Sequence, residues 1–368
     1  MKKIDRGFIL PSAAFAIRRG QIKLYKFIDK QPQIGDVAYG IILQIGQHSS
    51  MENASGRIHM IHDGTKAVFV FGNRYAPDFY EGIIPDEMTE VADLLARSAI
   101  IGIVKTKNSL IKDPTKVRIL GYVCDQAGNV LNTRDFPLIK PRSTVKNEPR
   151  AKMILVCGTS MNSGKSMAAA ACCWSLASMG YKVRASKVTG TAGLKDILLM
   201  NDAGASRYAD FTYLGYPSTY LLEKAQLLGI FNQLDLKYAN NPRNFWVVEF
   251  ADGIIQQETA MLLNSPEIIS RIHKLIFCAN DAFGAIGGLN ILKEKFGLVP
   301  DMLSGVCSSS PLHIRELTAF TDIPVFDSSE ADTNTLADAL LQPSKHSIPS
   351  KNDASELLQN SILLKDVI

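Results

Sequence analysis

The sequence predicts an α/β protein in which a smaller β-rich part precedes a parallel sheet covered by helices. The first 138 residues consist mainly of short runs rich in Ile, Val, Tyr and Phe, bounded by Gly, Asp and Asn, as in small β-barrels or sandwiches. From Met153 onward, near-continuous apolar runs alternate with helical patterns, which is typical of parallel strands buried on both faces. The 368 residues also exceed the size at which single cores stop growing, about 250 to 300 residues.

The β-rich part is expected to contain short strands and a single helix. The expected strands cover residues 21–27, 37–45, 66–71, 99–104 and 116–123. Residues 85–97 have the pattern of an amphipathic helix, with Pro85 near the start and Met88, Val91 and Leu94 on one face. This combination predicts a barrel or sandwich that carries one helix.

Four segments follow from these changes in pattern. A linker is expected at residues 139–150, because the stretch around it has two prolines, four basic residues and little apolar surface to bury. The segments are therefore a β-rich domain at 1–138, a linker at 139–150, a parallel-sheet domain at 151–342 and a tail at 343–368.

The second domain is expected to place its chemistry at one edge of its sheet. The expected strands cover residues 153–157, 182–188, 245–250, 275–279, 303–307 and 323–326. Ligands of such sheets bind at the carboxyl ends of the strands. Polar residues that directly follow a strand are therefore the candidates for a site.

The segment GTSMNSGKS, residues 158–166, follows the first of these strands and precedes an Ala-rich helical pattern. It predicts a phosphate-binding loop, because glycines that lead into a helix N-terminus expose backbone N–H groups to an anion. Five residues separate its outer glycines, against four in the common GxxxxGK[ST] form. The alternative is a purely structural glycine turn. The residues expected to contact a nucleotide are Gly158, Thr159, Ser160, Met161, Asn162, Ser163, Gly164, Lys165, Ser166 and Met167.

Charged residues at the ends of the next strands complete the expected site. Lys187 follows the second strand, where it is either a phosphate-binding cation or an ordinary turn lysine. Asp196, Asp202 and Asp210 come next, and Asp202 is the first choice for a magnesium ligand, with helix capping as the alternative. Glu249 ends the third strand, as a metal-binding or water-positioning carboxylate would.

Three further residues are expected to face a substrate. Thr189 and Thr191 follow Lys187, and Asp252 follows the third strand. Asp252 precedes a glycine, so a simple turn residue is the alternative.

Composition argues against several other classes of protein. The formal charge of +4 is spread along the chain without a basic tract, so neither nucleic acid nor a membrane surface is expected as a partner. Six cysteines without metal spacing predict reduced, buried thiols in the cytoplasm. The first residues resemble a signal sequence, but Asp5, Arg6 and Pro11 interrupt the apolar stretch, so a soluble, unprocessed chain is expected.

Residues 153–327 resemble the dethiobiotin synthetase group of P-loop NTPases. The loop of that group typically reads GTDTxVGKT, with the same five-residue gap, and Gly158, Thr159, Gly164, Lys165 and Ser166 match it. Its KPxxTG, SDA, VEGAGG and LGxINH segments have counterparts at residues 187–190, at Asp202, at residues 248–253 and at residues 282–290.

This chain departs from that group at Ser160, which replaces an acidic residue, and at Ala251 and Asp252, which replace glycines. The first domain is also foreign to the free-standing synthetase. The resemblance therefore implies a core that binds Mg-ATP and a reaction that activates a carboxylate or carbamate, with the acceptor left open.

The leading hypothesis is an enzyme that uses ATP and Mg²⁺ to phosphorylate a carboxylate-like small molecule. Lys165 holds the phosphates, while Ser166, Asp202 and Glu249 hold magnesium. Lys187 stabilises charge as the γ-phosphoryl moves to a substrate oxygen. The alternatives are an ATP-hydrolysing switch whose β-rich domain binds a protein, and a nucleotide-binding protein with negligible turnover. The oligomeric state, a homodimer included, stays open.

Overall fold

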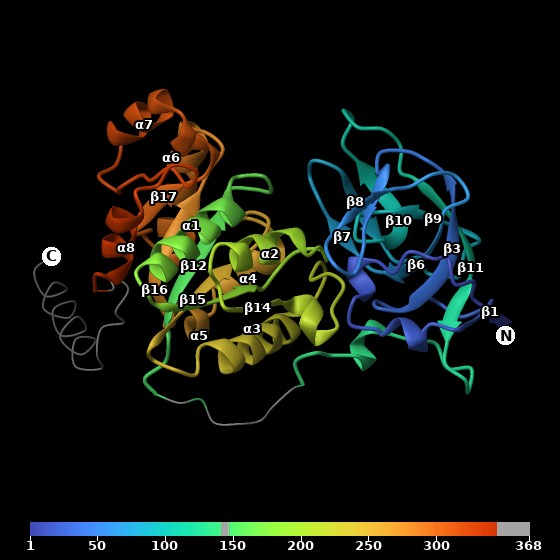
Figure 1. Ribbon diagram of the computed structural model, residues 1–368. Coiled ribbons are helices and arrows are strands. Elements are labelled where there is room, and N and C mark those ends of the chain that lie inside the picture. The colour runs from blue at the N-terminus through green and yellow to red at the C-terminus, as the bar shows by residue number, and fades with distance from the viewer. Residues whose placement is uncertain (141–145, 147, 344–368) are drawn as a thin grey trace, which may run out of the picture.

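The structure, a computed structural model, describes residues 1–140, 146 and 148–343. The chain forms two parts, each with its own large sheet, as Figure 1 shows. This arrangement confirms the expected mixed α/β class. Residues 141–145 and 147 of the expected linker, and residues 344–368 of the expected tail, lie outside the described residues.

The N-terminal part consists almost entirely of strands. They are β1 (Lys2–Lys3), β2 (Leu24–Lys26), β3 (Val37–Gln44), β4 (Ser50–Glu52), β5 (Ile58–Met60), β6 (Lys66–Phe71), β7 (Arg74–Tyr75), β8 (Tyr80–Ile83), β9 (Val91–Leu94), β10 (Ile100–Lys107) and β11 (Lys116–Cys124). The short 3-10 helices are η1 (Ser12–Ala14), η2 (Arg19–Gln21) and η3 (Thr133–Asp135). Strands β4 and β5 pair only with each other, and the rest form one sheet.

The main N-terminal sheet closes on itself. Strand β11 pairs with β3, β3 with β6, β6 with β10, β10 with β9, and β9 again with β11. Successive residues of β3 point to opposite faces, so Val37 and Tyr39 join one buried cluster while Ala38 joins another. Of the two expected architectures, the pairing therefore shows a barrel.

The helix expected at residues 85–97 is wrong. Residues Val91–Leu94 form strand β9, which bonds to β10 on one side and to β11 on the other. Of the apolar residues that match a helix face, Leu94 is buried in this strand, Val91 is exposed at its start and Met88 precedes it. Pairing across the barrel overrides the local pattern, as often happens with strand propensity.

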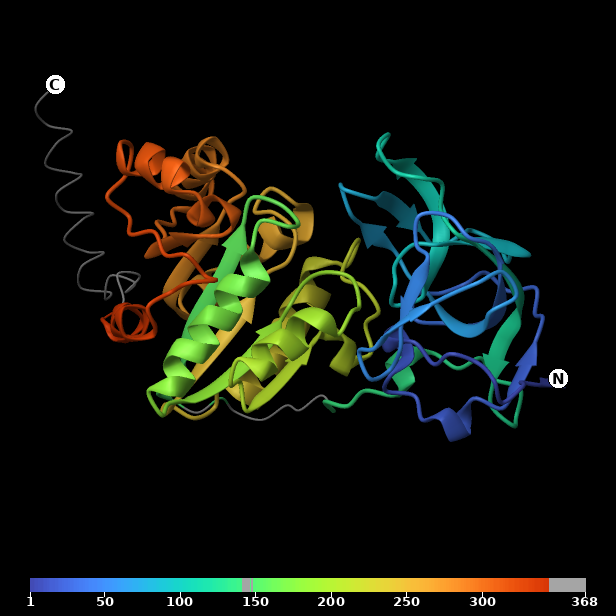
Figure 2. The ribbon, with the colours of Figure 1, turned by 45° about the horizontal axis from the view of Figure 1, so that its top comes forward.

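The C-terminal part is a parallel sheet with helices on both faces (Figure 2). Its strands are β12 (Lys152–Gly158), β13 (Lys182–Lys187), β14 (Arg207–Asp210), β15 (Asn244–Glu249), β16 (Ile272–Cys278) and β17 (Met302–Ser304). Its helices are α1 (Lys165–Ser178), α2 (Lys195–Asp202), η4 (Phe211–Leu214), α3 (Lys224–Tyr238), α4 (Gln257–Leu263), α5 (Pro266–Ile269), α6 (Ala282–Phe296), η5 (Val306–Ser309), α7 (Pro311–Thr318) and α8 (Thr333–Leu341).

The strand order is β14-β13-β15-β12-β16-β17, and every pair is parallel. Strand β14 was not expected, and the run at residues 323–326 contributes only an isolated bridge between Leu303 and Val325. The run at 303–307 turns into η5 after Ser304. The other expected strands of this part are confirmed to within a few residues.

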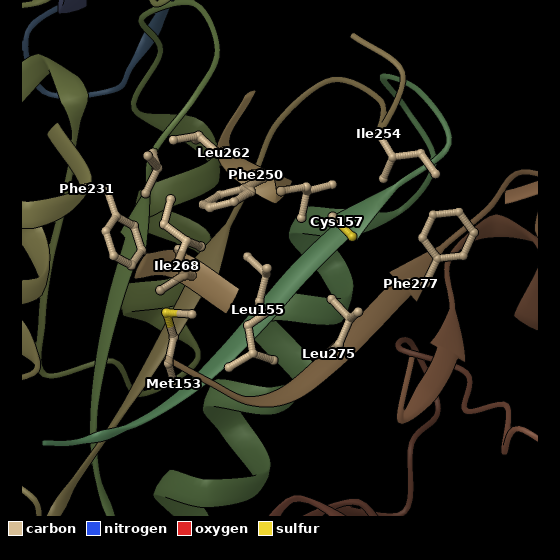
Figure 3. Close-up of a cluster of buried hydrophobic side chains, with 14 of the residues drawn as sticks. Met153, Leu155, Cys157, Phe231, Phe250, Ile254, Leu262, Ile268, Leu275 and Phe277 are labelled. Carbon is tan, nitrogen blue, oxygen red and sulfur yellow. The ribbon is translucent and has the colours of Figure 1, made fainter. Parts of the chain in front are cut away.

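Strand β12 runs through the centre of the sheet and is buried on both faces. Met153, Leu155 and Cys157 pack against α3 to α6 in the cluster drawn in Figure 3. Ile154 and Val156 point the other way, toward α1, α2 and α8. Each fully buried Leu or Ile contributes about 1.5 to 3 kcal/mol, so the strand that leads into the loop is firmly anchored.

All six cysteines are buried and free, as expected. Among the described residues, no helix is long and apolar enough to cross a membrane.

The barrel rests against the carboxyl edge of the parallel sheet. The Leu194 N–H donates to Oε2 of Glu52 at 2.9 Å, and the Tyr220 hydroxyl donates to Oε1 of Glu81 at 2.9 Å. The Thr133 hydroxyl donates to the carbonyl of Gly215 at 2.7 Å in a buried position. The two parts therefore meet where the sequence places the site.

Candidate functional site

The loop after β12 folds tightly around glycines. Asn162 and Gly164 both have left-handed backbones, with φ of 60° and 88°, and α1 begins at the next residue, Lys165. A Cβ on Gly164 would lie 2.6 Å from the Cα of Gly305, so a side chain would not fit there. The free N–H groups at the start of α1 make this turn suited to an anion.

Lys165 lies under this loop and is only 5% exposed. Its ammonium donates to the carbonyl of Ser160 at 2.5 Å and to the Ser163 hydroxyl at 3.3 Å. Burial lowers the pKa of Lys165, and the carboxylates of Glu249 and Asp252 oppose that shift. The loop thus holds a buried cation against its own backbone.

Lys187 and Glu249 meet because β13 and β15 are neighbours in register. The two residues are paired positions at the carboxyl ends of these strands, and Lys187 Nζ lies 3.6 Å from Glu249 Oε1. Asp196, in the first turn of α2, forms an ion pair and hydrogen bond with the same ammonium. Three charged side chains from three elements therefore converge beside the loop.

The pKa values in this cluster follow from burial and from these charges. Burial alone lowers the pKa of Lys187, but Asp196 and Glu249 outweigh it and raise the value above normal. Burial raises the pKa of Asp196, but Lys187 and the Ser166 hydroxyl bring it below normal. For Glu249, which lies farther from Lys187, burial prevails and the pKa stays raised.

A magnesium ion fits this cluster when phosphate is present. The Ser166 hydroxyl lies beside Asp196 and Glu249 and acts to lower the pKa of both carboxyl groups. Glu249 is 1% exposed, and its Oε2 atom has no hydrogen-bond partner. Within the described ranges, no group of three or more His, Cys, Asp or Glu could hold a metal ion alone. Magnesium at phosphate sites usually takes one or two carboxylates and completes its shell with phosphate and water, which this donor set allows.

Asp202 is not part of this cluster. It is the last residue of α2 and is exposed, and it does not line the cavity beside the loop. Asp196 lines that cavity instead, two helical turns earlier. The structure thus brings Asp196, and not the expected Asp202, into the cluster, because the start of α2 faces the carboxyl edge of the sheet.

Of the residues expected to face a substrate, Asp252 and Thr191 line the cavity and Thr189 does not. The Thr189 hydroxyl accepts from the Ala251 N–H at 2.9 Å and donates to the Ala251 carbonyl at 3.2 Å, so it ties two strand ends together. Asp252 has a left-handed backbone, with φ of 61°, which is unusual for a residue other than glycine and common near functional sites.

The cavity between the two parts has a volume of about 550 Å³. The parallel-sheet part lines it with Met161, Asn162, Gly164, Lys165, Ser166, Met167, Lys187, Gly190, Thr191, Ala192, Gly193, Lys195, Asp196, Leu199, Glu249, Ala251 and Asp252. The barrel lines it with His48, Glu52, Ile58, Arg74, Tyr75, Ala76, Phe79, Ala96, Arg97 and Ser98. Gly158, Thr159, Ser160 and Ser163 belong to the same loop but do not line the cavity.

Sequence reasoning missed the barrel wall entirely. Arg74, His48 and Arg97 come from separate strands and loops, and no spacing in the sequence links them. A weak signal existed for Asp196, since an aspartate in a first helical turn after a strand end lies at the active edge.

No family profile matches the chain, and no curated protein is similar to it in sequence. Among solved structures, a signal recognition particle receptor FtsY from Elizabethkingia anophelis in complex with GDP is 10% identical, with a TM-score of 0.34, over 57% of this chain and 69% of that one. FtsY from Mycoplasma mycoides is 13% identical, with a TM-score of 0.33, over 53% of this chain and 68% of that one. These scores are too low to inform the function.

Proposed function

We propose that this protein is a P-loop enzyme that uses Mg-ATP to phosphorylate a carboxylate-like small molecule, in the manner of dethiobiotin synthetase. The observation that carries the proposal is the meeting of Ser166, Asp196, Glu249 and Lys187 beside the phosphate loop, with one buried oxygen of Glu249 unpartnered. A nucleotide-binding turn without turnover does not need such a cluster.

Each residue has a role that its position supports. Lys165 and the N–H groups at the start of α1 hold the phosphates. Ser166, Asp196 and Glu249 hold magnesium, which when bound neutralises phosphate charge. Lys187 keeps its proton because its pKa is raised, so it can stabilise the charge of the transferred phosphoryl group.

The acceptor would bind between the two parts. The cavity continues from the loop to the barrel wall, and about 300 to 1,000 Å³ is the usual size of small-molecule sites. We therefore propose that residues 1–138 and 151–342 are two domains that share one active site, joined by residues 139–150. The buried free cysteines are consistent with a reducing compartment such as the cytoplasm.

A hydrolysing switch is the second candidate, and one contact favours it. The loop residue Asn162 donates from Nδ2 to Oδ2 of Asp78 in the barrel at 2.5 Å. A change in the loop on hydrolysis would thus reach the barrel directly. Strong stimulation of ATP hydrolysis by a small carboxylate favours the enzyme, whereas stimulation only by a protein favours the switch.

Binding and turnover of ATP by Lys165→Ala test the core of the proposal. Loss of a charge-assisted contact to phosphate should weaken Mg-ATP binding by about 10- to 100-fold. The matched control is Lys182→Ala, because Lys182 is exposed at the start of β13, at the opposite end of the strand from the site. Equal ATP affinity in wild type and Lys165→Ala, measured by calorimetry, would refute nucleotide binding at this loop. Parallel titrations with GTP establish the base preference.

A further inference from the structure

The barrel wall of the cavity contains a buried arginine without an ionic partner. Arg74, in β7, is 9% exposed, and its Nε atom has no hydrogen-bond partner. No carboxylate among residues 1–140, 146 and 148–343 forms an ion pair with it. Burial lowers the pKa of Arg74 to about 10, which still leaves the guanidinium charged at neutral pH.

Two aromatic side chains hold Arg74 in place. Its Nη1 lies 3.0 Å from Nε2 of His48, and its guanidinium carbon lies 5.1 Å from the ring centre of Phe79. Burial lowers the pKa of His48 to about 4, and the positive charge of Arg74 contributes to the same shift. Nε2 of His48 also lies 3.0 Å from the carbonyl oxygen of Leu95. This nitrogen accepts the arginine N–H when the imidazole proton is on Nδ1, and it donates to Leu95 when the proton is on Nε2.

Packing does not account for a cation in this position. Buried charges are normally paired, because taking an unpaired one out of water costs several kcal/mol. The buried arginine of the parallel-sheet part follows that rule: Arg150 forms an ion pair with Asp235 at 2.8 Å. Arg74 lacks such a carboxylate, so its charge is available to a ligand.

Arg74 faces the phosphate loop across the cavity. Asp252 is the largest favourable charge acting on Arg74, and Lys165 and Lys187, which line the same cavity, act favourably on Asp252 as well. Arg97, which is exposed, lines the same wall as Arg74. An anion bound at Arg74 would therefore lie opposite the phosphates of a nucleotide held at the loop.

We infer that Arg74, oriented by His48 and Phe79, binds a carboxylate of the small-molecule acceptor, so that the barrel supplies the acceptor half of the active site. This inference rests on the proposed function and adds the substrate class and its binding residue. The planar guanidinium matches a carboxylate with two parallel hydrogen bonds. Arg97, at the same wall, sets a preference for acceptors that carry a second anionic group.

The terminal phosphate of the nucleotide is the other anion that Arg74 could contact. The loop wall already provides Lys165 and Lys187 for the phosphates, whereas Arg74 belongs to the barrel wall of the cavity. The geometry therefore favours the acceptor. The two sources differ in one measurable respect, because only a phosphate contact discriminates ATP from ADP.

Arg74→Met tests the inference, and Arg118→Met is the matched control. Arg118 is an exposed arginine of β11 in the same barrel, and it does not line the cavity. Thermal unfolding is followed in saturating Mg-ADP with acetate, malonate or succinate, each against chloride at equal ionic strength. We expect the carboxylates to raise the Tm of wild type and Arg118→Met, and to bind Arg74→Met about 10-fold or more weakly.

The ligand-free Tm separates function from structure. Because Arg74 has no ionic partner, Arg74→Met should unfold at the wild-type temperature or above it, and a fall of several degrees would show a structural role instead. The inference is also overturned if carboxylates act no more strongly than chloride on wild type, or if Arg74→Met keeps the full response. Weaker binding of ATP with unchanged binding of ADP would assign Arg74 to the terminal phosphate. Failure of wild type to bind any nucleotide would instead refute the proposed function.

Discussion

The two walls of the cavity hold their cations in different ways. On the loop wall, Lys187 contacts Asp196 and lies 3.6 Å from Glu249, and Lys165 donates to the loop carbonyl of Ser160. On the barrel wall, Arg74 is similarly buried, and its guanidinium contacts the imidazole of His48 and the face of the Phe79 ring. Lys187 is thus paired with a carboxylate, whereas Arg74 forms no ion pair with any residue that the structure describes.

This difference indicates which kind of ligand each wall can bind. A wall that already carries carboxylates beside its lysine is suited to a ligand that brings magnesium with it, because those carboxylates would serve as ligands of the metal. A wall with an unpaired cation is suited to a metal-free anion. Three substitutions test this contrast, in order of decreasing expected effect.

The largest effect is expected for Asp196→Asn, which removes one carboxylate of the loop wall. We expect magnesium-dependent ATP turnover, or the apparent affinity for magnesium, to fall by about 10- to 100-fold. Asp202→Asn, at the exposed end of the same helix, is the control and should behave as wild type. A magnesium titration of turnover distinguishes the two positions. Loss of activity in Asp202→Asn alone would restore the expectation drawn from the sequence.

A smaller effect is expected for Gly253→Ala. Gly253 belongs to the segment that follows β15, and it lies against the loop. A Cβ on Gly253 would lie 2.1 Å from the carbonyl oxygen of Thr159, so Gly253→Ala must displace the loop backbone. Such overpacking costs about 1 to 3 kcal/mol, and we expect Mg-ATP affinity to fall by about 10-fold or more.

Gly287→Ala is the control for this glycine. Gly287 lies inside α6 with open space at its Cβ position, so alanine there should leave ATP affinity unchanged and stabilise the helix by about 0.5 to 1 kcal/mol. Equal ATP affinities in both variants, measured by calorimetry, would show that the loop tolerates the displacement.

The smallest effect is expected for Asp210→Asn. This variant tests whether an unpaired buried charge lowers the stability of this protein. Burial raises the pKa of Asp210 from 3.8 to about 6, although hydrogen bonds from Thr212 oppose the shift. The native state therefore binds this proton more tightly than the unfolded chain, and stability falls as the pH rises from about 4 through 6.

Asp210→Asn cannot ionise and escapes this loss. We therefore expect the variant to become more stable relative to wild type as the pH rises. The difference in free energy of unfolding, Asp210→Asn minus wild type, should be about 1 to 3 kcal/mol larger at pH 7.5 than at pH 4. Urea unfolding of the ligand-free protein at both pH values measures this difference. A gap that is the same at both pH values would contradict the raised pKa.

The loop wall was largely predictable because it is local. Gly158 to Ser166 are consecutive, and their strand and helix context is visible in the apolar runs on either side. Lys187 and Glu249 could be placed beside the loop from the sequence because each ends a buried strand. Asp196 was missed in favour of Asp202, since both lie in one polar stretch and only the direction of α2 decides which end faces the edge.

The sequence by itself determined the parallel sheet, the glycine-bounded loop after β12 and the charged strand ends, because each depends on residues close together in the chain. Only the tertiary structure decided how the barrel closes. It closes through β9, a strand in a segment that was expected to be a helix, which pairs with both β10 and β11. It alone also placed Arg74 and His48 in the same cavity as Lys165. Barrel pairing and the contact between the two parts bring together residues about a hundred positions apart in the sequence, and no local pattern encodes such a contact.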